Sequence, residues 1–130
     1  MEPLSLGLTA RRSLTVAEEH TAVRWGSGAV QVLSTPQMIA LMEGAAVDAV
    51  EPLLPAGQQT VGSRLEIEHL APSAVGAHVT AQAELIAIEG RRLTFRVSAE
   101  DGAGLIGRGT HERFVVDVAR FMAGAAQRPR

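Results

Sequence analysis

The chain has 130 residues, of which 46% are hydrophobic and 20% charged, and it contains no cysteine. This composition is ordinary for one globular domain with a sizeable core, and the lack of cysteine excludes disulfides, thiol nucleophiles and thiolate metal ligands. With 12 Lys and Arg against 14 Asp and Glu, the formal net charge of −2 provides no basic footprint for nucleic acid or a membrane surface. A small-molecule partner is expected instead.

The N-terminal part predicts neither export nor membrane insertion. It lacks the charged and then long apolar regions of a signal peptide, and no run approaches the ~18 apolar residues of a spanning helix. We therefore expect a cytoplasmic protein. Residues 8 to 16 are predicted to form the first strand, and residues 17 to 33, which contain Trp-Gly-Ser-Gly at 25 to 28, are predicted to form a loop.

A strongly apolar helix is predicted after this loop. Thr35 or Ser34 suits the N-cap and Pro36 the first helical position. Pro52 ends the run. Apolar residues occupy most sides of the segment, which is typical of a buried helix, so Glu43 near its centre requires an explanation. An unpaired buried carboxylate is costly, and we expect Glu43 to be either a general base or half of a structural ion pair.

From residue 60 onward the apolar residues follow the period of a strand. Along residues 60 to 71, His69 falls on the same side as Leu65 and Ile67, and Arg64 with its polar alternates falls on the other. The His69 side chain is therefore predicted to point inward.

Turn signals at 89–90 and 101–104 divide residues 77 to 116 into a three-stranded antiparallel meander. Gly107 and Gly109 within its last strand allow close approach of either a ligand or another strand. The tail from 118 to 130 has a short helical pattern that decays into a polar end, which we expect to be partly frayed.

The order of these elements predicts the fold. A strand, one long apolar helix and four antiparallel strands indicate an α+β domain spanning residues 1 to 130, in which an antiparallel β-sheet wraps around the central helix. The long edge strand and the incompletely covered helix are surfaces that a symmetric copy would cover. We therefore expect a homodimer.

Four segments carry a joint motif: Thr35-Pro36 through Leu41-Met42-Glu43, Val61-Gly62-Ser63 leading to His69-Leu70-Ala71-Pro72, Glu89-Gly90-Arg91-Arg92-Leu93, and Ile106-Gly107-Arg108-Gly109-Thr110-His111-Glu112-Arg113. Together they resemble the fluoroacetyl-CoA thioesterase-like family of hotdog-fold thioesterases. The resemblance implies a dimer with active sites at the subunit interface that hydrolyses acyl-CoA thioesters to carboxylate and coenzyme A. It implies no metal and no cofactor other than the coenzyme A of the substrate. The implied catalytic set is Thr35, Glu43 and His69, with Gly62 and Arg113 also lining the site.

The residue chemistry suits thioester hydrolysis. Glu43 is a base or orienting carboxylate, His69 a proton shuttle, and Thr35 a nucleophile or a holder of the attacking water, next to helix N–H groups that favour negative charge. Thr35 and Glu43 are eight residues apart, about 12 Å of helical rise and about 80° of turn. Either Thr35 precedes the regular helix and folds back, or the site combines groups from two chains. Arg91 and Arg92 suit the phosphates of coenzyme A.

Weaker candidates and other functions stay open. His111 beside Glu112 and Arg113 is expected in a surface network, and a metal site has no local support in ligand spacing. The fluoroacetyl-specific enzyme of the family has phenylalanines just before its catalytic threonine, whereas residues 26 to 30 have none, so a different short acyl group is expected. The alternatives are a non-catalytic acyl-CoA or acyl-carrier binding module and a hotdog hydratase.

Overall fold

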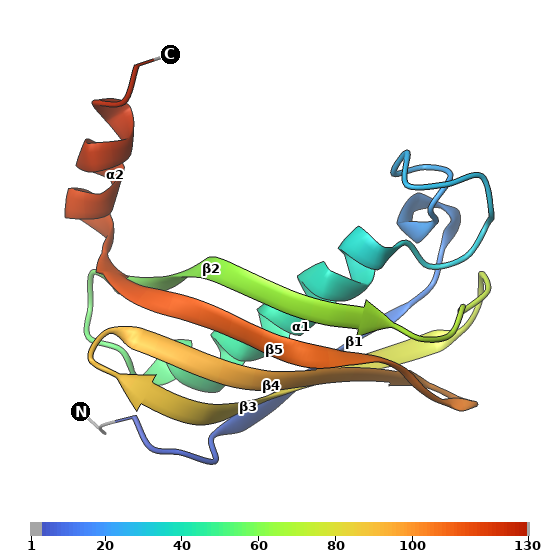
Figure 1. The fold of residues 1–130 in the computed structure, drawn as a ribbon, viewed down its shortest axis with the longest axis horizontal. Helices are drawn as coiled ribbons and strands as arrows, with labels where there is room; N and C mark the ends of the chain where they lie inside the picture. The colour runs from blue at the N-terminus through green and yellow to red at the C-terminus, as the bar shows by residue number, and fades with distance from the viewer. Residues whose placement is uncertain (1–3, 130) are drawn as a thin grey trace.

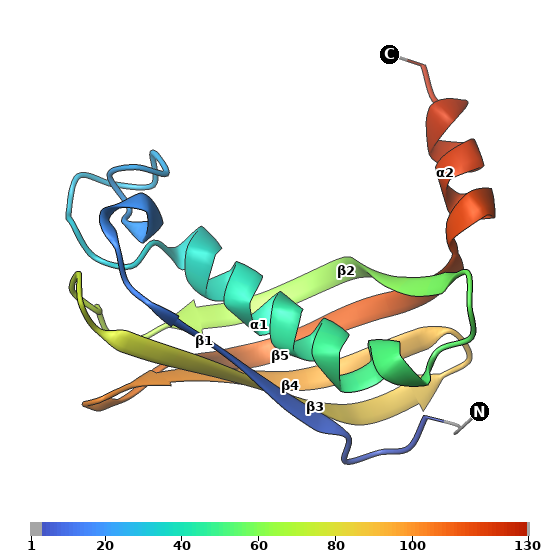
Figure 2. The same cartoon turned by 180° about the vertical axis from the view of Figure 1, so that it is seen from behind.

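A computed structural model describes residues 4–129. It contains one antiparallel sheet of five strands in the order β1-β3-β4-β5-β2, with a long helix on one face (Figure 1). The strands are β1 (Thr9–Thr15), β2 (Gln58–His69), β3 (His78–Glu89), β4 (Arg92–Asp101) and β5 (Gly104–Asp117). The helices are α1 (Thr35–Val50) and α2 (Val118–Ala126), and two short 3₁₀ turns cover Glu18–His20 and Glu51–Leu53. The predicted α+β fold with a sheet wrapped around one helix is confirmed (Figure 2).

Of the two residues predicted to suit the N-cap, Ser34 takes the position, and only the place of Pro36 in the helix differs from the prediction, by one residue. Ser34 is the N-cap, and its hydroxyl accepts a hydrogen bond from the backbone N–H of Gln37 at 3.3 Å. Thr35 is therefore the first helical residue and Pro36 the second. Because Ser34 supplies the cap, the hydroxyl of Thr35 is left available for another partner.

The core lies between α1 and the central strands. Alternating apolar residues in two strands of the meander are fully buried: Val79, Ala81, Ala83 and Leu85 of β3, and Leu93, Phe95, Val97 and Ala99 of β4. On α1 they meet Met38, Met42, Ala45 and Ala46, which are also fully buried. The alanines let the helix lie close to the sheet, and the larger side chains fill the remaining space.

A bidentate ion pair between Arg12 and Asp48 connects the edge strand β1 to α1. The guanidinium of Arg12 donates from Nε and Nη2 to the two carboxylate oxygens of Asp48 at 3.0 and 2.9 Å. Gly44 leaves room for it, because a Cβ at this position would collide with the Arg12 side chain. The pair is about half exposed, so its stabilising effect is at most about 1 kcal/mol, and its geometry chiefly sets the position of the helix.

The opposite edge strand, β2, is poorly covered. Leu65 lies on the predicted inner face, opposite the buried His111 in β5, but remains 44% exposed. The reason is the position of α1, which packs mainly against β1 and β3 and makes few contacts with β4 and β2. One chain thus leaves part of the inner face of β2 and its outer edge open.

Helix α2 projects away from the sheet beyond β2 (Figure 1). It begins at Asp117, whose carboxylate accepts from the N–H of Arg120 at 3.0 Å, and it confirms the helical pattern of the tail. Its apolar residues Phe121 and Met122 are exposed. Arg130 lies outside the described residues. Over residues 4–129 no helix is both long and apolar enough to cross a membrane.

The two glycines of β5 make room for protein neighbours. A Cβ on Gly109 would collide with the backbone carbonyl of Glu66 in β2, and one on Gly107 would collide with the sulfur of Met38. Of the two predicted alternatives, close approach of another strand explains Gly109, and close approach of α1 explains Gly107.

We predict that Gly109→Ala lowers the free energy of unfolding by about 1 to 3 kcal/mol, because backbone must shift to admit one methyl group. The measurement is urea unfolding followed by circular dichroism. Gly102→Ala is the matched control: the added Cβ meets nothing within 4 Å, and a change below about 0.5 kcal/mol is expected. Equal effects of the two substitutions would contradict the steric account.

Candidate active site

Thr35 and His69 meet at one end of α1. Thr35 is the first residue of the helix and His69 the last residue of β2, and the Thr35 hydroxyl lies 2.8 Å from Nδ1 of His69. Two of the three predicted catalytic side chains are therefore in direct hydrogen-bond contact. A hydroxyl bonded to an imidazole is the arrangement from which histidine accepts a proton.

His69 points inward as predicted. Its Nε2 is buried and has no hydrogen-bond partner within residues 4–129. Burial lowers the pKa of His69, and a backbone contact with Ala71 opposes this shift. The imidazole is therefore neutral near pH 7, the state in which it acts as a base.

A cavity of about 370 Å³ opens over this pair. Its walls come from the segment before α1 and from the end of β2, and are largely apolar. The lining residues are Ala22, Ser27, Gly28, Val30, Val32, Leu33, Thr35, His69, Leu70, Ala71 and Pro72. Trp25 does not line it: its indole nitrogen donates to the carbonyl of Glu19 at 2.8 Å and its side chain is half exposed.

The helix start supplies fewer free N–H groups than predicted. Pro36 has none, the N–H of Gln37 donates to the Ser34 hydroxyl, and the N–H of Met38 donates to the Ser34 carbonyl at 3.1 Å. Only the N–H of Thr35 is left without a partner among the described residues at this terminus. The positive end of the helix dipole still favours a negative charge here, but within residues 4–129 the Thr35 N–H is the one backbone group at this terminus that can donate to an oxyanion.

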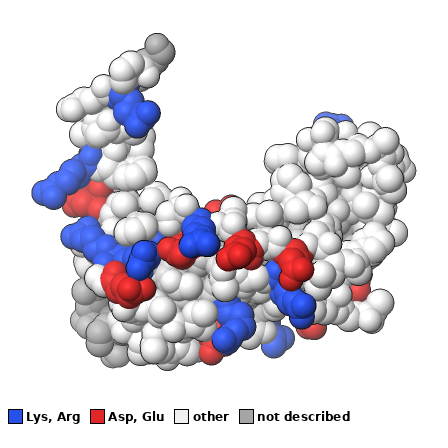
Figure 3. Space-filling model, in the orientation of Figure 1, with Lys and Arg blue, Asp and Glu red and all other residues white. Residues whose placement is uncertain are grey.

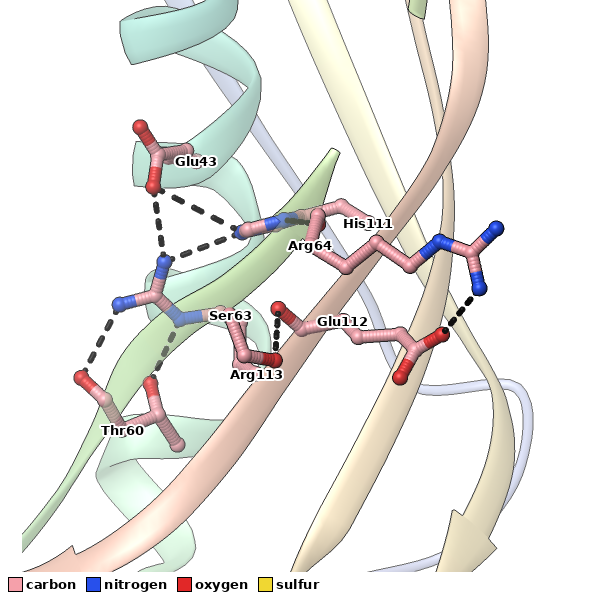
Figure 4. A network of polar contacts seen from close by, with 7 residues as sticks. All are labelled: Glu43, Thr60, Ser63, Arg64, His111, Glu112 and Arg113. Carbon is pink, nitrogen blue, oxygen red and sulfur yellow. Dashed lines mark hydrogen bonds and ion pairs between the residues drawn. The ribbon is translucent and has the colours of Figure 1, made fainter. Parts of the chain in front are cut away.

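Glu43 belongs to a second cluster, farther along α1 (Figure 4). Its Oε2 accepts from Nη1 of Arg113 at 3.3 Å and lies 3.8 Å from Nε2 of His111. The guanidinium is also held by Thr60, whose hydroxyl accepts from Nε at 2.8 Å and whose carbonyl accepts from Nη2 at 3.0 Å. Burial lowers the pKa of Arg113, with the charge of Glu43 opposing, and the group stays protonated.

Of the two alternatives for Glu43, the ion pair is present, with Arg113 as its partner. Two expectations about burial in this cluster are wrong. The Glu43 side chain is 37% exposed and so is not deeply buried. His111 is fully buried instead of joining a surface network, because it shares the inner face of β5 with Arg113 while Glu112 points to the other side. Thr60 carries no motif of its own, and sequence reasoning missed it. The spacing His-x-Arg in an alternating strand is the signal that indicates the buried pair.

Gly62 lies against the Glu43 carboxylate, at a register shift between Gly62 and Arg64 in β2. A Cβ on Gly62 would stand 2.9 Å from Oε2 of Glu43. The predicted pair of Gly62 and Arg113 is thus brought together with Glu43. A second cavity of about 310 Å³ opens here, lined by Glu43, Gly62, Ser63, Arg64, Leu65 and His111.

Within one chain the two clusters are separate. Thr35 lies in the regular helix and bonds His69, so it does not fold back toward Glu43, and the ~12 Å rise of eight helical residues stands between them. Glu43 and Thr35 line different cavities. Among residues 4–129 no group of three or more His, Asp or Glu side chains is placed as a metal site.

The two predicted phosphate-binding arginines lie elsewhere. Arg92 pairs with Glu89 at 3.0 Å and with Glu112 at 3.8 Å. Arg91 donates to the carbonyl of Val115 at 3.5 Å and lines a small cavity at the base of α2. On the outer face of the sheet, acidic and basic side chains alternate (Figure 3). Neither arginine lines the cavities of Thr35 or Glu43.

The sequence pattern of the fluoroacetyl-CoA-specific thioesterases, the FlK family, matches residues 16–119. The chain belongs to this family. A fluoroacetyl-CoA thioesterase from Streptantibioticus cattleyicolor is 44% identical over 98 residues, which are 75% of this chain and 70% of that protein. The FlK family resemblance seen in the four motif segments is therefore confirmed.

Solved structures of FlK-like thioesterases have the same fold. The structure of the fluoroacetyl-CoA thioesterase FlK matches with a TM-score of 0.93 and 34% identity, over 99% of this chain and all (100%) of the other. A thioesterase superfamily member from Thermus thermophilus matches with a TM-score of 0.89 and 30% identity, over 98% of this chain and 94% of the other. The predicted hotdog fold is confirmed.

We predict that the protein loses stability as the pH falls below about 6.5. Burial lowers the pKa values of His69 and His111 in the folded chain, so the unfolded chain takes up protons that the folded chain does not. The free energy of unfolding should be level above about pH 7.5 and fall toward about pH 5.5 in urea titrations. His111→Gln should reduce this slope. Higher stability at the acid end would contradict the burial of these imidazoles.

Proposed function

We propose that this protein is a thioesterase that hydrolyses a short acyl-CoA to carboxylate and coenzyme A, using Thr35, His69 and Glu43. The observation that carries the proposal is the hydrogen bond of 2.8 Å between the Thr35 hydroxyl and His69, at a helix N-terminus that opens into a cavity. Membership of the FlK family supports the reaction class. The relative from Streptantibioticus cattleyicolor is named a fluoroacetyl-CoA thioesterase.

The proposed chemistry divides among three groups. The thioester carbonyl sits over Thr35, whose hydroxyl either attacks it or holds the water that does, and His69 accepts the proton released. The negative charge on the carbonyl oxygen is stabilised by the end of the helix dipole and the Thr35 N–H. The proton then passes from His69 to the departing thiolate of coenzyme A. Where Thr35 attacks, a water for which Glu43 is the base or orienting carboxylate then cleaves the acyl ester on Thr35, which releases the carboxylate and restores the hydroxyl. Where Thr35 holds the water, Glu43 orients that water.

Glu43 reaches this chemistry from a second copy of the chain. Direct contact with Thr35 of the same chain is ruled out by the intervening helix, so we infer a homodimer in which each site takes Thr35 and His69 from one chain and Glu43 from the other. The open edge of β2 and the exposed Leu65 suit a copy related by two-fold symmetry. The molecule is also hollowed over β2, between α2 and the segment before α1 (Figure 3).

The acyl group we propose is short and differs from fluoroacetyl. Side chains lining the first cavity include Ala22, Val30 and Leu70, with no phenylalanine among them. Aliphatic side chains of this kind suit a small aliphatic group, and the cavity lacks the aromatic side chains that would enclose a halogenated one. Arg91 and Arg92 remain candidates for the coenzyme A phosphates. A cytoplasmic location, where acyl-CoA esters are made and used, is part of the proposal.

Thiol release from a panel of short and medium acyl-CoA esters, fluoroacetyl-CoA included, tests the reaction. We expect hydrolysis of a short non-fluorinated ester, and a fall of at least about a hundredfold in Glu43→Gln. Circular dichroism establishes that the variant is folded. Tight binding of coenzyme A with no thiol release from any ester would contradict the thioesterase function and indicate a non-catalytic acyl-CoA binding module.

Leu65→Asp should convert the dimer to a monomer, because it places a charge on the open inner face of β2. Multi-angle light scattering should give twice the mass of one chain for the wild type and the mass of one chain for the variant, with thioesterase activity lost together with the dimer. The control is Leu105→Asp, which alters a leucine of similar exposure in the β4–β5 hairpin and should stay dimeric and active. A monomeric, fully active wild type would refute the shared site.

A further inference from the structure

His111 has one hydrogen-bond partner for each ring nitrogen, and its Nε2 also lies 3.8 Å from Oε2 of Glu43 (Figure 4). Its Nδ1 lies 2.8 Å from the carbonyl oxygen of Arg64, and its Nε2 lies 3.1 Å from Nη1 of Arg113. A carbonyl oxygen only accepts a hydrogen bond and a guanidinium only donates. The two partners therefore specify a neutral imidazole with its hydrogen on Nδ1 and its lone pair on Nε2.

This lone pair controls how the Arg113 guanidinium faces Glu43. Nη1 of Arg113 carries two hydrogens and has two acceptors, Nε2 of His111 at 3.1 Å and Oε2 of Glu43 at 3.3 Å. Thr60 holds the other side of the guanidinium through Nε and Nη2. The plane of the guanidinium is thus fixed from both sides, and a single N–H of Nη1 is directed to the carboxylate.

The carboxylate is held by one oxygen only. Oε2 of Glu43 makes the contacts with Arg113 and His111, whereas Oε1 makes no hydrogen bond or ion pair within residues 4–129. Because Gly62 has no side chain, nothing from β2 displaces Oε2 from its position. The arrangement leaves Oε1 for a water or substrate group in the second cavity.

We propose that His111 is a positioning residue for Glu43: its Nε2 lone pair holds the Arg113 guanidinium so that Glu43 presents Oε1 to the reacting groups. This inference rests on the proposed role of Glu43 in thioester hydrolysis. His111 borders the second cavity beside Glu43, and the role proposed for it is exerted through Arg113.

The surroundings of His111 keep it in the required form. Arg113 of β5 and Glu43 of α1 are the charged groups facing its ring, the Arg64 carbonyl comes from β2, and the Phe95 ring of β4 lies 6.4 Å away between centroids. Burial lowers the pKa of His111 and the charge of Arg113 adds to the lowering, whereas the Arg64 carbonyl and the charge of Glu43 oppose it. A proton on Nε2 would point at Nη1 of Arg113 and break the contact that orients it.

Two amide substitutions at His111 distinguish the contribution of Nε2 from that of Nδ1. The side-chain carbonyl of glutamine reaches the position of Nε2 and accepts from Arg113, whereas asparagine reaches only the position of Nδ1. We expect kcat for the preferred acyl-CoA to fall about tenfold or more in His111→Asn and to stay within about threefold of wild type in His111→Gln. Free energies of unfolding are measured for both. Equal kcat values in the two variants, or losses that follow the folded fraction, would overturn the proposal.

A second readout does not depend on activity. Nitrogen-15 NMR of the wild-type imidazoles at about pH 7 should show His111 with Nδ1 protonated and Nε2 unprotonated. The chain has four histidines. Replacing His20, His69 and His78 one at a time identifies their resonances, and the remaining resonance belongs to His111. This assignment does not require that the His111→Gln variant folds. An Nε2–H tautomer or an imidazolium would overturn the role of His111. A wild type that shows the expected tautomer but hydrolyses no thioester would instead refute the proposed function.

Discussion

Eight residues of regular α-helix between Thr35 and Glu43 are the constraint on which the proposed mechanism depends. A helix rises about 1.5 Å per residue, so the two groups stand about 12 Å apart and open into different cavities. The helix cannot bend to join them, because its middle is packed through Met38, Met42 and Ala45 onto the sheet. In the proposed mechanism each chain therefore contributes two half-sites, which the association of two copies would complete. The same dimer would cover the exposed inner face of β2, so the stability of the assembly and its activity would share one surface.

The two half-sites differ in charge, and therefore in the chemistry that each can support. The half around Thr35 and His69 is neutral and largely apolar, which suits an uncharged acyl group and a base that must take up a proton. The half around Glu43 is charged, and its charge is balanced by the buried Arg113. A buried guanidinium is tolerated only when its donors are used, and Thr60, His111 and Glu43 accept from four of its N–H groups. Glu43 is thereby held through Oε2 by a partner that leaves the other carboxylate oxygen unused.

Much of the fold follows from local patterns in the chain. Strict alternation in β3 and β4 predicts the buried face correctly because both edges of these central strands are paired and one face packs against α1. The start of α1 is harder, because Ser34 and Thr35 both suit the N-cap and only tertiary contact with His69 decides between them. His111 is misplaced when its charged neighbours Glu112 and Arg113 are considered without the strand period. The separation of Thr35 and Glu43 is predictable from helix geometry, whereas the Arg113 pairing of Glu43 depends on contacts between residues far apart in the chain and has no local signal.

The most direct test of the shared site is complementation between two inactive variants. Thr35→Ala and Glu43→Gln are each purified as inactive, folded dimers, then mixed in equal amounts under conditions that exchange subunits. A mixed dimer has one site with intact Thr35, His69 and Glu43 and one site that lacks both Thr35 and Glu43, so random exchange should restore about a quarter of wild-type thioesterase activity. A mixture that exchanges subunits yet remains as inactive as its parents would show that Thr35 and Glu43 act from the same chain, and would contradict the account.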